Sequence, residues 1–188
     1  AWTDPILITT QCNQFDVCGI CGGNGIPGLH LGWGIEGAIG SSHKVDASYL
    51  SPHVNMSARL ESSSKQFGVQ LLLSDAFVKQ LYSSSLKADM RPLDVVTVKG
   101  SLQPITLYTY QPAEYPDDMD NDSKIRFTEQ WLVAFDAYVD GKWNVCREAL
   151  KVCLVELPGD GPCQTMIRTI QEKEAPEDWK GYRALTSK

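Results

Sequence analysis

The chain has 188 residues, of which 43% are hydrophobic and 21% are charged. These values are ordinary for a globular protein, and the length suits one domain with or without an appendage. A net charge of −6 argues against a nucleic-acid binder, because no basic stripe is present to neutralise phosphates. No apolar run reaches the roughly 20 residues that a membrane-spanning helix needs. We therefore expect a globular protein that binds no nucleic acid and has no membrane span in this chain.

Composition divides the chain into four parts. Residues 1–27 are irregular and rich in Cys and Gly, and residues 28–111 alternate strand-like and helix-like stretches. Residues 112–123 are acidic and interrupted by proline, which is typical of a linker. Residues 124–188 are mostly helical in pattern. The predicted fold class is α/β (α+β), with a mixed domain followed by helices.

The N-terminal part contains three cysteines, Cys12, Cys18 and Cys21. One Cys-x-x-Cys pair suggests zinc, but a structural zinc site needs four ligands, and His30 is the nearest further candidate. Residues 16–25 also resemble a Cys-Gly-rich repeat of extracellular modular proteins, in which the cysteines would pair as disulfides. The redox state of Cys18 and Cys21 stays open.

The elements expected in residues 28–111 follow from apolar patterning and from capping residues. Ser is a good helix N-cap, Pro suits the first helical turn, and Gly commonly ends a helix. In chain order we expect a strand over 29–35, a helix from Ser51-Pro52 to Gly68, a strand over 69–73, a helix from Ser74 to about Tyr82, and strands over 95–99 and 105–110.

The tail should begin with two helices, over 125–139 and 143–157, joined by a turn at Asp140-Gly141, before a third helix over about 163–172. Two such helices with aromatic and small residues at their crossing resemble one tetratricopeptide unit. A single unit cannot bury its own face well, so we expect it to pack on the α/β part or on a partner.

Several short sequence motifs follow one another along residues 29–100 in a characteristic order. They are Leu29-His-Leu-Gly32, Glu36-Gly-Ala-Ile-Gly40, Lys44-Val-Asp46, Val54-Asn-Met-Ser-Ala-Arg-Leu-Glu61, Lys65-Gln-Phe-Gly-Val69 and Val96-Thr-Val-Lys-Gly100. In this order and spacing they resemble the second half of a class III adenylate or guanylate cyclase catalytic domain. The tail resembles a segment that follows this domain in some large multidomain cyclases.

The resemblance implies a ferredoxin-like domain that works as a head-to-tail pair, with a nucleoside triphosphate, ATP or GTP, at the interface. Asn55 would orient the ribose, and Arg59 would stabilise charge on the reacting phosphate. Residues i and i+4 of a helix project together, and a guanidinium is a natural partner for a phosphoryl group. Lys99 would contact the triphosphate, and Ser48 stands at the base-selecting position, which leaves the choice of base open.

Each residue also has a plainer interpretation. Asn55 could bond a loop carbonyl, Arg59 could be a solvated surface residue, and Lys99 could belong to an ordinary turn. His30, His43 and His53 share no metal-ligand spacing, so we expect them to be structural or exposed.

The resemblance also implies magnesium or manganese, held by two aspartates in the first half of the family's domain. This chain has no strand with the pattern Asp-Ile-x-Gly-Phe, and Asp4 and Asp16 have no such context. Ser51-Pro52 also replaces the family's Gly-Asp. We therefore expect no metal ligands in this chain.

Two functions from different classes follow. The chain is either part of a cyclase whose partner supplies the metal carboxylates, and inactive alone, or a non-catalytic cyclase-like scaffold or regulatory subunit. A third possibility, an extracellular disulfide-bearing protein, is supported by residues 12–25 alone. The first residue, Ala1, and the abrupt change of composition at residues 27–29 suggest missing sequence. The expected setting is the cytoplasmic face of a longer membrane-associated protein.

Overall fold

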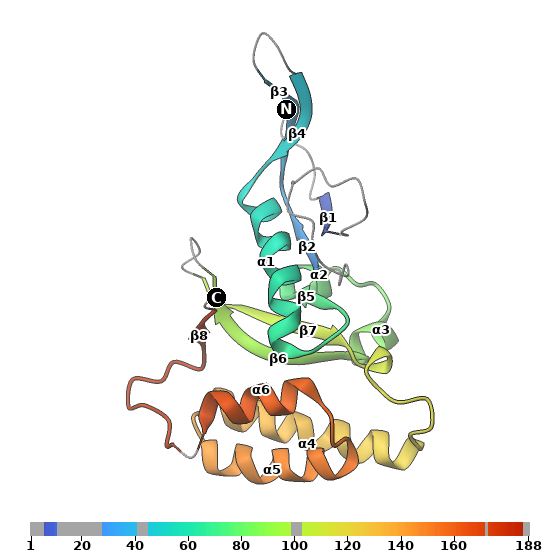
Figure 1. Ribbon diagram of the computed structural model, residues 1–188, viewed down its shortest axis with the longest axis vertical. Coiled ribbons are helices and arrows are strands. Elements are labelled where there is room, and N and C mark those ends of the chain that lie inside the picture. The colour runs from blue at the N-terminus through green and yellow to red at the C-terminus, as the bar shows by residue number, and fades with distance from the viewer. Residues whose placement is uncertain (1–5, 11–27, 41–44, 99–102, 172, 186–188) are drawn as a thin grey trace.

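The computed structural model describes residues 6–10, 28–40, 45–98, 103–171 and 173–185. Within these residues a six-stranded mixed sheet has the order β1-β2-β5-β7-β6-β8 (Figure 1). Its strands are β1 (Ile6–Thr10), β2 (Gly28–Gly32), β5 (Leu72–Ser74), β6 (Met90–Thr97), β7 (Ile105–Tyr110) and β8 (Arg183–Ala184). The β2–β5 and β6–β8 pairs are parallel, and the others are antiparallel. The predicted mixed α and β class is confirmed.

Helix α1 (Pro52–Phe67) begins and ends where its capping residues predict. The Ser51 side chain accepts a hydrogen bond from the backbone N–H of His53 at 3.0 Å, which satisfies one of the unpaired donors of the first turn. Gly68 ends the helix with φ of 66°, a left-handed conformation that costs glycine little. Local sequence therefore determines both ends of this helix.

Other boundaries differ from the prediction. The strand expected over 29–35 splits into β2 and β3 (Ile35–Gly40), and β3 pairs with β4 (Val45–Leu50) in a separate two-stranded ribbon. Helix α2 (Asp75–Lys79) is shorter than expected, and α3 (Ser84–Ala88) follows it. Strand β6 starts five residues before the predicted position. Proline is rare inside strands except at bulges, and Pro92 lies at a register shift of this strand, so the sequence did not predict a strand there.

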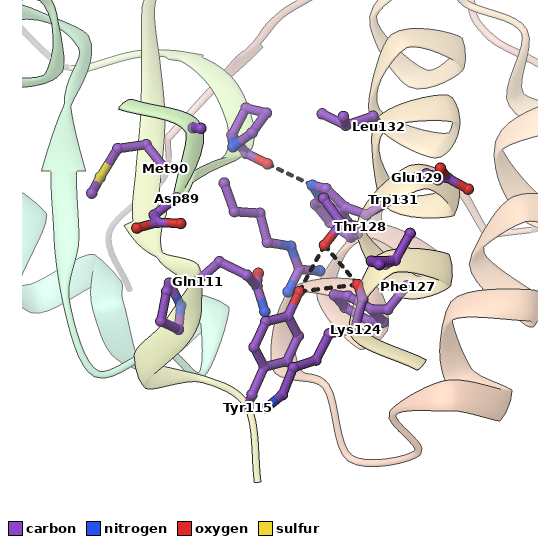
Figure 2. A pocket seen from close by; sticks show the side chains of 15 residues that line it. Asp89, Met90, Gln111, Tyr115, Lys124, Phe127, Thr128, Glu129, Trp131 and Leu132 are labelled. Atoms are coloured by element: carbon purple, nitrogen blue, oxygen red, sulfur yellow. Dashed lines mark hydrogen bonds between the residues drawn. The ribbon is translucent and has the colours of Figure 1, made fainter. Parts of the chain in front are cut away.

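The tail forms a helical layer of α4 (Asn121–Val139), α5 (Trp143–Glu156) and α6 (Gly161–Ile170). A short 3-10 turn, η1 (Gln111–Ala113), follows β7, and α4 starts inside the stretch expected to be a linker, with Asp120 as its N-cap. The indole Nε1–H of Trp131 in α4 donates to the Pro92 carbonyl in β6 at 2.8 Å (Figure 2). The layer is thus hydrogen-bonded to the sheet.

The last described residues return to the sheet, which the helical pattern of the tail did not predict. Trp179 donates from Nε1 to the carbonyls of Tyr138 and Val139, both at 3.1 Å. Two residues of β8 then pair with β6, and Arg183 Nε lies 2.8 Å from Asp94 Oδ2. A two-residue strand is too short to give a period-2 signal, so sequence patterning could not find it.

A single hydrophobic cluster joins the two halves. It includes Leu60 and Phe67 of α1, Leu107 of β7, Trp131 of α4 and Leu150 of α5, all at most 2% exposed. The expectation that the helical hairpin packs on the α/β part is confirmed.

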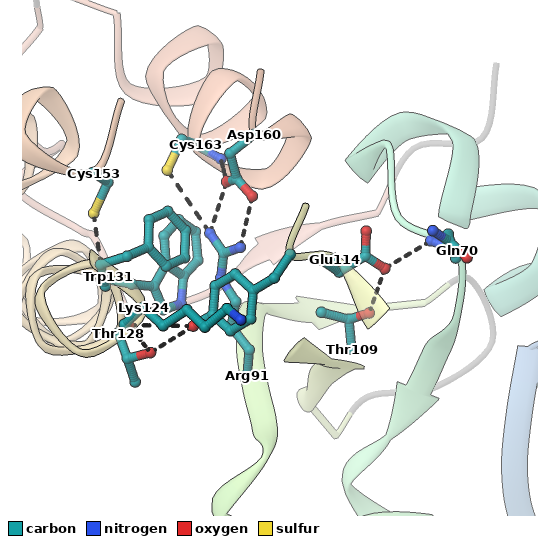
Figure 3. A network of polar contacts seen from close by, with 12 residues as sticks. Gln70, Arg91, Thr109, Glu114, Lys124, Thr128, Trp131, Cys153, Asp160 and Cys163 are labelled. Atoms are coloured by element: carbon teal, nitrogen blue, oxygen red, sulfur yellow. Dashed lines mark hydrogen bonds and ion pairs between the residues drawn. The ribbon is translucent and has the colours of Figure 1, made fainter. Parts of the chain in front are cut away.

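One buried ion pair crosses this junction. Arg91 of β6 makes two 2.8 Å hydrogen bonds to the carboxylate of Asp160, and both side chains are 3% exposed (Figure 3). The guanidinium carbon lies 3.6 Å from the centroid of a Trp131 ring, and Asp160 also caps α6 by accepting from the Cys163 N–H at 2.8 Å. Although burial opposes ionisation of Asp160, the bonds from Arg91 hold the pKa of that carboxyl below its usual value.

Replacing Gly161 should separate the helical layer from α1. A Cβ at this position would clash with the Phe67 carbonyl oxygen and lie 3.0 Å from Gly68 Cα, so Gly161→Ala should cost about 1–3 kcal/mol of unfolding free energy. A Cβ on Gly159 would meet nothing within 4 Å, so Gly159→Ala is the matched control. Urea denaturation of both variants tests this, and equal stabilities would contradict the packing described.

Removing the charge of Asp160 should leave a buried, uncompensated guanidinium. We expect Asp160→Asn to lower the unfolding free energy by about 3 kcal/mol, although the amide oxygen can still cap α6. Asp140→Asn, which removes the partner of the exposed Lys142, should cost less than about 1 kcal/mol. Thermal and urea unfolding measure both, and a loss for Asp160→Asn no larger than the control's would refute the role of the pair.

Candidate functional site

Two of the predicted site residues lie together on α1. Asn55 is exposed and Arg59 is half-buried, and they are four positions apart in the sequence, so both side chains project from the same face of the helix. Asn55 stands near the first turn, close to the Ser51 cap. This face of α1 therefore presents an amide and a guanidinium side by side, which suits hydroxyl and phosphate groups.

The other two predicted residues come from different elements. Ser48 belongs to β4 and is paired with Gly37 of β3 in the ribbon, which stands at one end of the molecule (Figure 1). Lys99 comes two residues after the end of β6 at Thr97 in the sequence and lies outside the described residues. The structure thus groups Asn55 with Arg59, and the roles of all four residues remain predictions.

Close backbone contact fixes α1 against β2. A Cβ on Gly28 would lie 2.6 Å from the backbone nitrogen of Glu61 and 2.8 Å from the Ser57 carbonyl oxygen. The Ser57 hydroxyl donates to the Gly28 carbonyl at 3.1 Å. Gly32 similarly makes room for the ring of His53, where a Cβ would overlap Cγ. Two glycines on one strand therefore set how closely the helix approaches the sheet.

A polar chain joins the start of α1 to the sheet. Ser74 Oγ lies 2.7 Å from His30 Nδ1, and His30 Nε2 lies 2.8 Å from His53 Nδ1. Ser74 Oγ also accepts from the backbone N–H of Phe77 at 3.4 Å, so its hydroxyl is available to donate to His30. When Ser74 donates, His30 is the tautomer that carries its proton on Nε2 and donates it to His53 Nδ1, and the two rings stack with centroids 5.0 Å apart. This arrangement needs both imidazoles neutral.

Burial, with a smaller contribution from the neighbouring His53, lowers the pKa of His30 to about 4, and Asp75 only partly opposes this shift. Burial also lowers the pKa of His53. The prediction that these histidines are structural agrees with their contacts. Their pairing was not predictable, since 23 residues separate them and nothing in the sequence marks two distant histidines as neighbours.

The described residues do not fit a metal ion. Among them, no group of three or more His, Cys, Asp or Glu side chains is placed to hold one. His30 and His53 face each other and not a shared third ligand. No step of a reaction can therefore be assigned to a metal held by this part of the chain.

No protein-family model matches the chain. The adenylate cyclase of Anabaena cylindrica is 30% identical over 82 residues, which is 43% of this chain and 16% of that protein. Adenylate cyclase 1 of Rhizobium meliloti (strain 1021) is 28% identical over 81 residues, or 43% of this chain and 12% of that protein. These matches support a class III nucleotide cyclase-like domain in part of this chain.

The similarity to one cyclase extends beyond that domain. The terminal-differentiation specific adenylate cyclase of Dictyostelium discoideum is 22% identical over 141 residues, which is 75% of this chain and 6% of that protein. A match of this length must reach into the helical tail, since it exceeds residues 1–111. The chain spans less than a fifth of the length of each of these three relatives.

Two solved structures of a bacterial light-regulated adenylyl cyclase also match. Each is 30% identical in sequence and covers 46% of this chain, with a TM-score of 0.39. The match covers 24% of one of those chains and 23% of the other. Separately, none of the helices described here is both long and apolar enough to cross a bilayer.

The histidine pair should make stability depend on pH. The folded-state pKa of His30, about 4, lies below the unfolded value of 6.5, so only the unfolded chain gains this proton as the pH falls through that interval. Stability present above pH 6.5 should therefore decrease toward pH 4, by up to about 3 kcal/mol.

Urea unfolding of wild type and His30→Gln at pH 7.5, 6.0 and 5.0 measures this effect. The variant should be less stable at pH 7.5 but should lose much less stability on acidification. Parallel pH profiles for the two proteins would show that His30 does not titrate as its burial requires.

Proposed function

We propose that this chain supplies the ribose- and phosphate-contacting half of an adenylate cyclase site. The observation that carries the proposal is the shared face of Asn55 and Arg59 on a helix with fixed ends, in a chain similar to three adenylate cyclases. The names of these relatives favour ATP over GTP, a choice that Ser48 alone leaves open.

In this proposal the 3′-oxygen of the ribose attacks the α-phosphorus of ATP. A bond forms between these atoms, the bond from the α-phosphorus to the bridging oxygen breaks, and pyrophosphate leaves. Asn55 positions the ribose, and Arg59 stabilises the negative charge that develops on the α-phosphoryl oxygens. Lys99 contacts the β- and γ-phosphates, which leave as pyrophosphate, and Ser48 faces the base.

The rest of the site belongs to a partner. The proposed arrangement is a ferredoxin-like half that pairs head-to-tail with a second cyclase domain. That domain supplies the carboxylates for magnesium or manganese and accepts the 3′ proton, so this chain is inactive alone. The proposed setting is the cytoplasmic face of a longer membrane-associated protein, where nucleoside triphosphates are available.

A second candidate is a non-catalytic scaffold or regulatory subunit. It is favoured by the absence of a metal-binding group among the residues described and by Ser51-Pro52 at the start of α1, which replaces the family's Gly-Asp. In this alternative the tetratricopeptide-like hairpin of α4 and α5 is the working surface.

When it is purified natively together with its partner domain, the protein should form cyclic AMP from ATP in excess Mn²⁺ or Mg²⁺, and less cyclic GMP from GTP. Arg59→Ala should lower turnover about 100-fold or more, because it removes charge stabilisation that is needed in the transition state. Asn55→Ala should also lower turnover strongly. Arg168→Ala, an exposed change on α6, is the matched control and should leave turnover unchanged.

The outcomes separate the two candidates. Turnover that is equal in Arg59→Ala, Asn55→Ala and the control would refute the assigned site. If no product forms, ATP binding that Arg59→Ala weakens would support a half-site lacking its partner. No product and no nucleotide binding would favour the non-catalytic subunit.

A further inference from the structure

A pocket of about 320 Å³ opens between the start of β6, the 3-10 turn η1 and α4 (Figure 2). Its walls are mostly apolar and include Met90, Pro92, Pro112, Trp131 and Leu132. It lies where the α/β part meets the helical layer, and neither Asn55 nor Arg59 lines it. The pocket is therefore a second candidate site, separate from the one on α1.

Several polar side chains of the walls are already hydrogen-bonded within the chain. The Trp131 indole donates to the Pro92 carbonyl at 2.8 Å, and the Thr128 hydroxyl donates to the Lys124 carbonyl at 2.8 Å. The Tyr115 hydroxyl lies 2.7 Å from the same Thr128 oxygen. Because these groups have partners, the walls offer a ligand mainly apolar contact.

The mouth of the pocket exposes apolar side chains of α4. Ile125 is 56% exposed and Leu132 is 44% exposed, and both line the pocket. The volume is at the lower end of the range for small-molecule sites, which usually bury most of their ligand. Apolar surface that extends from a cavity onto the exposed face of a helix is more typical of a protein–protein contact. We therefore expect side chains of a larger partner to fill the pocket.

The length of the pocket along α4 limits the shape of that partner. Its lining residues on this helix run from Lys124 to Leu132, so at 1.5 Å per residue this wall is about 12 Å long. That length corresponds to about two helical turns. A groove of this kind accepts apolar side chains that are three or four residues apart on a helical segment.

The rim of the pocket is acidic. Asp89 lies on the sheet side and Glu129 on α4, and neither carboxylate forms an ion pair with a described residue (Figure 2). Of the two basic residues in the lining, Arg91 is neutralised by Asp160, which leaves Lys124. The segment that precedes Lys124 adds four aspartates, Asp117, Asp118, Asp120 and Asp122. A cationic partner is therefore favoured here, and an anionic one is repelled.

We propose that this groove binds a short basic amphipathic helix of another protein. Two apolar side chains of that helix, about one turn apart, enter the pocket and lie against Pro92, Pro112 and Leu132. Lysine or arginine side chains beside them face Asp89 and Glu129. Burial of the apolar side chains supplies most of the affinity, and the acidic rim orients the helix and speeds its approach. This binding is independent of the cyclase reaction.

A suitable probe is a fluorescein-labelled synthetic peptide of about 14 residues, with leucine on one helical face and lysine on the other. One counterpart has glutamate in place of lysine, and a second has serine in place of leucine. Fluorescence anisotropy titrations with the full chain give the dissociation constants. We expect the basic amphipathic peptide to bind at least about fivefold more tightly than either counterpart, and to lose about fivefold or more in affinity between about 50 and 500 mM NaCl. In ¹⁵N-labelled protein it should shift the indole resonance of Trp131.

A charge variant tests the acidic rim. Asp89→Asn combined with Glu129→Gln should weaken binding of the basic peptide about fivefold or more and should reduce its salt dependence, because the attraction at the rim is lost. Glu177→Gln combined with Asp178→Asn removes the same charge from an exposed segment that does not line the pocket. This second variant is the matched control and should bind the peptide as wild type does.

Leu132→Gln tests the apolar contact, and Val152→Gln on α5 is its control. The two side chains are 44% and 42% exposed, and of the two Leu132 lines the pocket. Leu132→Gln should weaken peptide binding about fivefold or more, and Val152→Gln should leave it unchanged, while both variants keep the wild-type melting temperature. The proposal is overturned if the basic peptide binds no more tightly than its counterparts. It is also overturned if either pocket variant binds the peptide as tightly as its control.

Discussion

The buried pair of Arg91 and Asp160 is the constraint on which the rest of the structure depends. Removing two charges from water is costly, and the cost is offset here because the pair is bidentate, the guanidinium lies against Trp131, and the same carboxylate caps α6. The pair fixes the start of α6 relative to β6. Since Gly161, the next residue, lies against Phe67 and Gly68, the same contact also fixes the C-terminal end of α1.

Helix α1 is thus held at both ends by contacts that do not involve Asn55 or Arg59. At its start, the Ser51 cap and the stacking of His53 on His30 connect it to β2 and, through Ser74, to β5. At its end, Gly68 adjoins the helical layer. The spacing of Asn55 and Arg59 follows from helix geometry alone, but their placement in space depends on the tail, far along the sequence. A change in the tail can therefore affect the candidate site without touching it.

Capping and turn residues predicted those helix ends that depend on neighbouring residues alone. The Ser51 cap, the Gly68 stop and the Asp140-Gly141 turn act within a few residues. The helix ends that they predict lie close to the observed ones. The histidine pair, the Arg91–Asp160 pair and strand β8 depend on partners 23 to 89 residues away, and sequence periodicity carries no information about such partners. The start of β6 was missed because it contains a proline, which is rare inside strands. Of the candidate site, Asn55 and Arg59 could be placed on one face from their spacing. The position of Ser48 on a separate ribbon could not be predicted, because the single strand expected over 29–35 included the start of β3.

Strand β6 shows why the two halves form one core although an acidic stretch separates them in sequence. It buries two charged side chains, and each finds its partner in the tail: Arg91 pairs with Asp160, and Asp94 pairs with Arg183. Burial raises the pKa of Asp94, and the contact with Arg183 only partly opposes this, so the carboxyl depends on its partner to remain ionised. Without the tail, β6 would present both groups unpaired beside the apolar residues that now pack on α4. The same strand ends at Thr97, two residues before Lys99 in the sequence. The helical layer is therefore a structural requirement of the cyclase-like half, whichever of the two functions this chain performs.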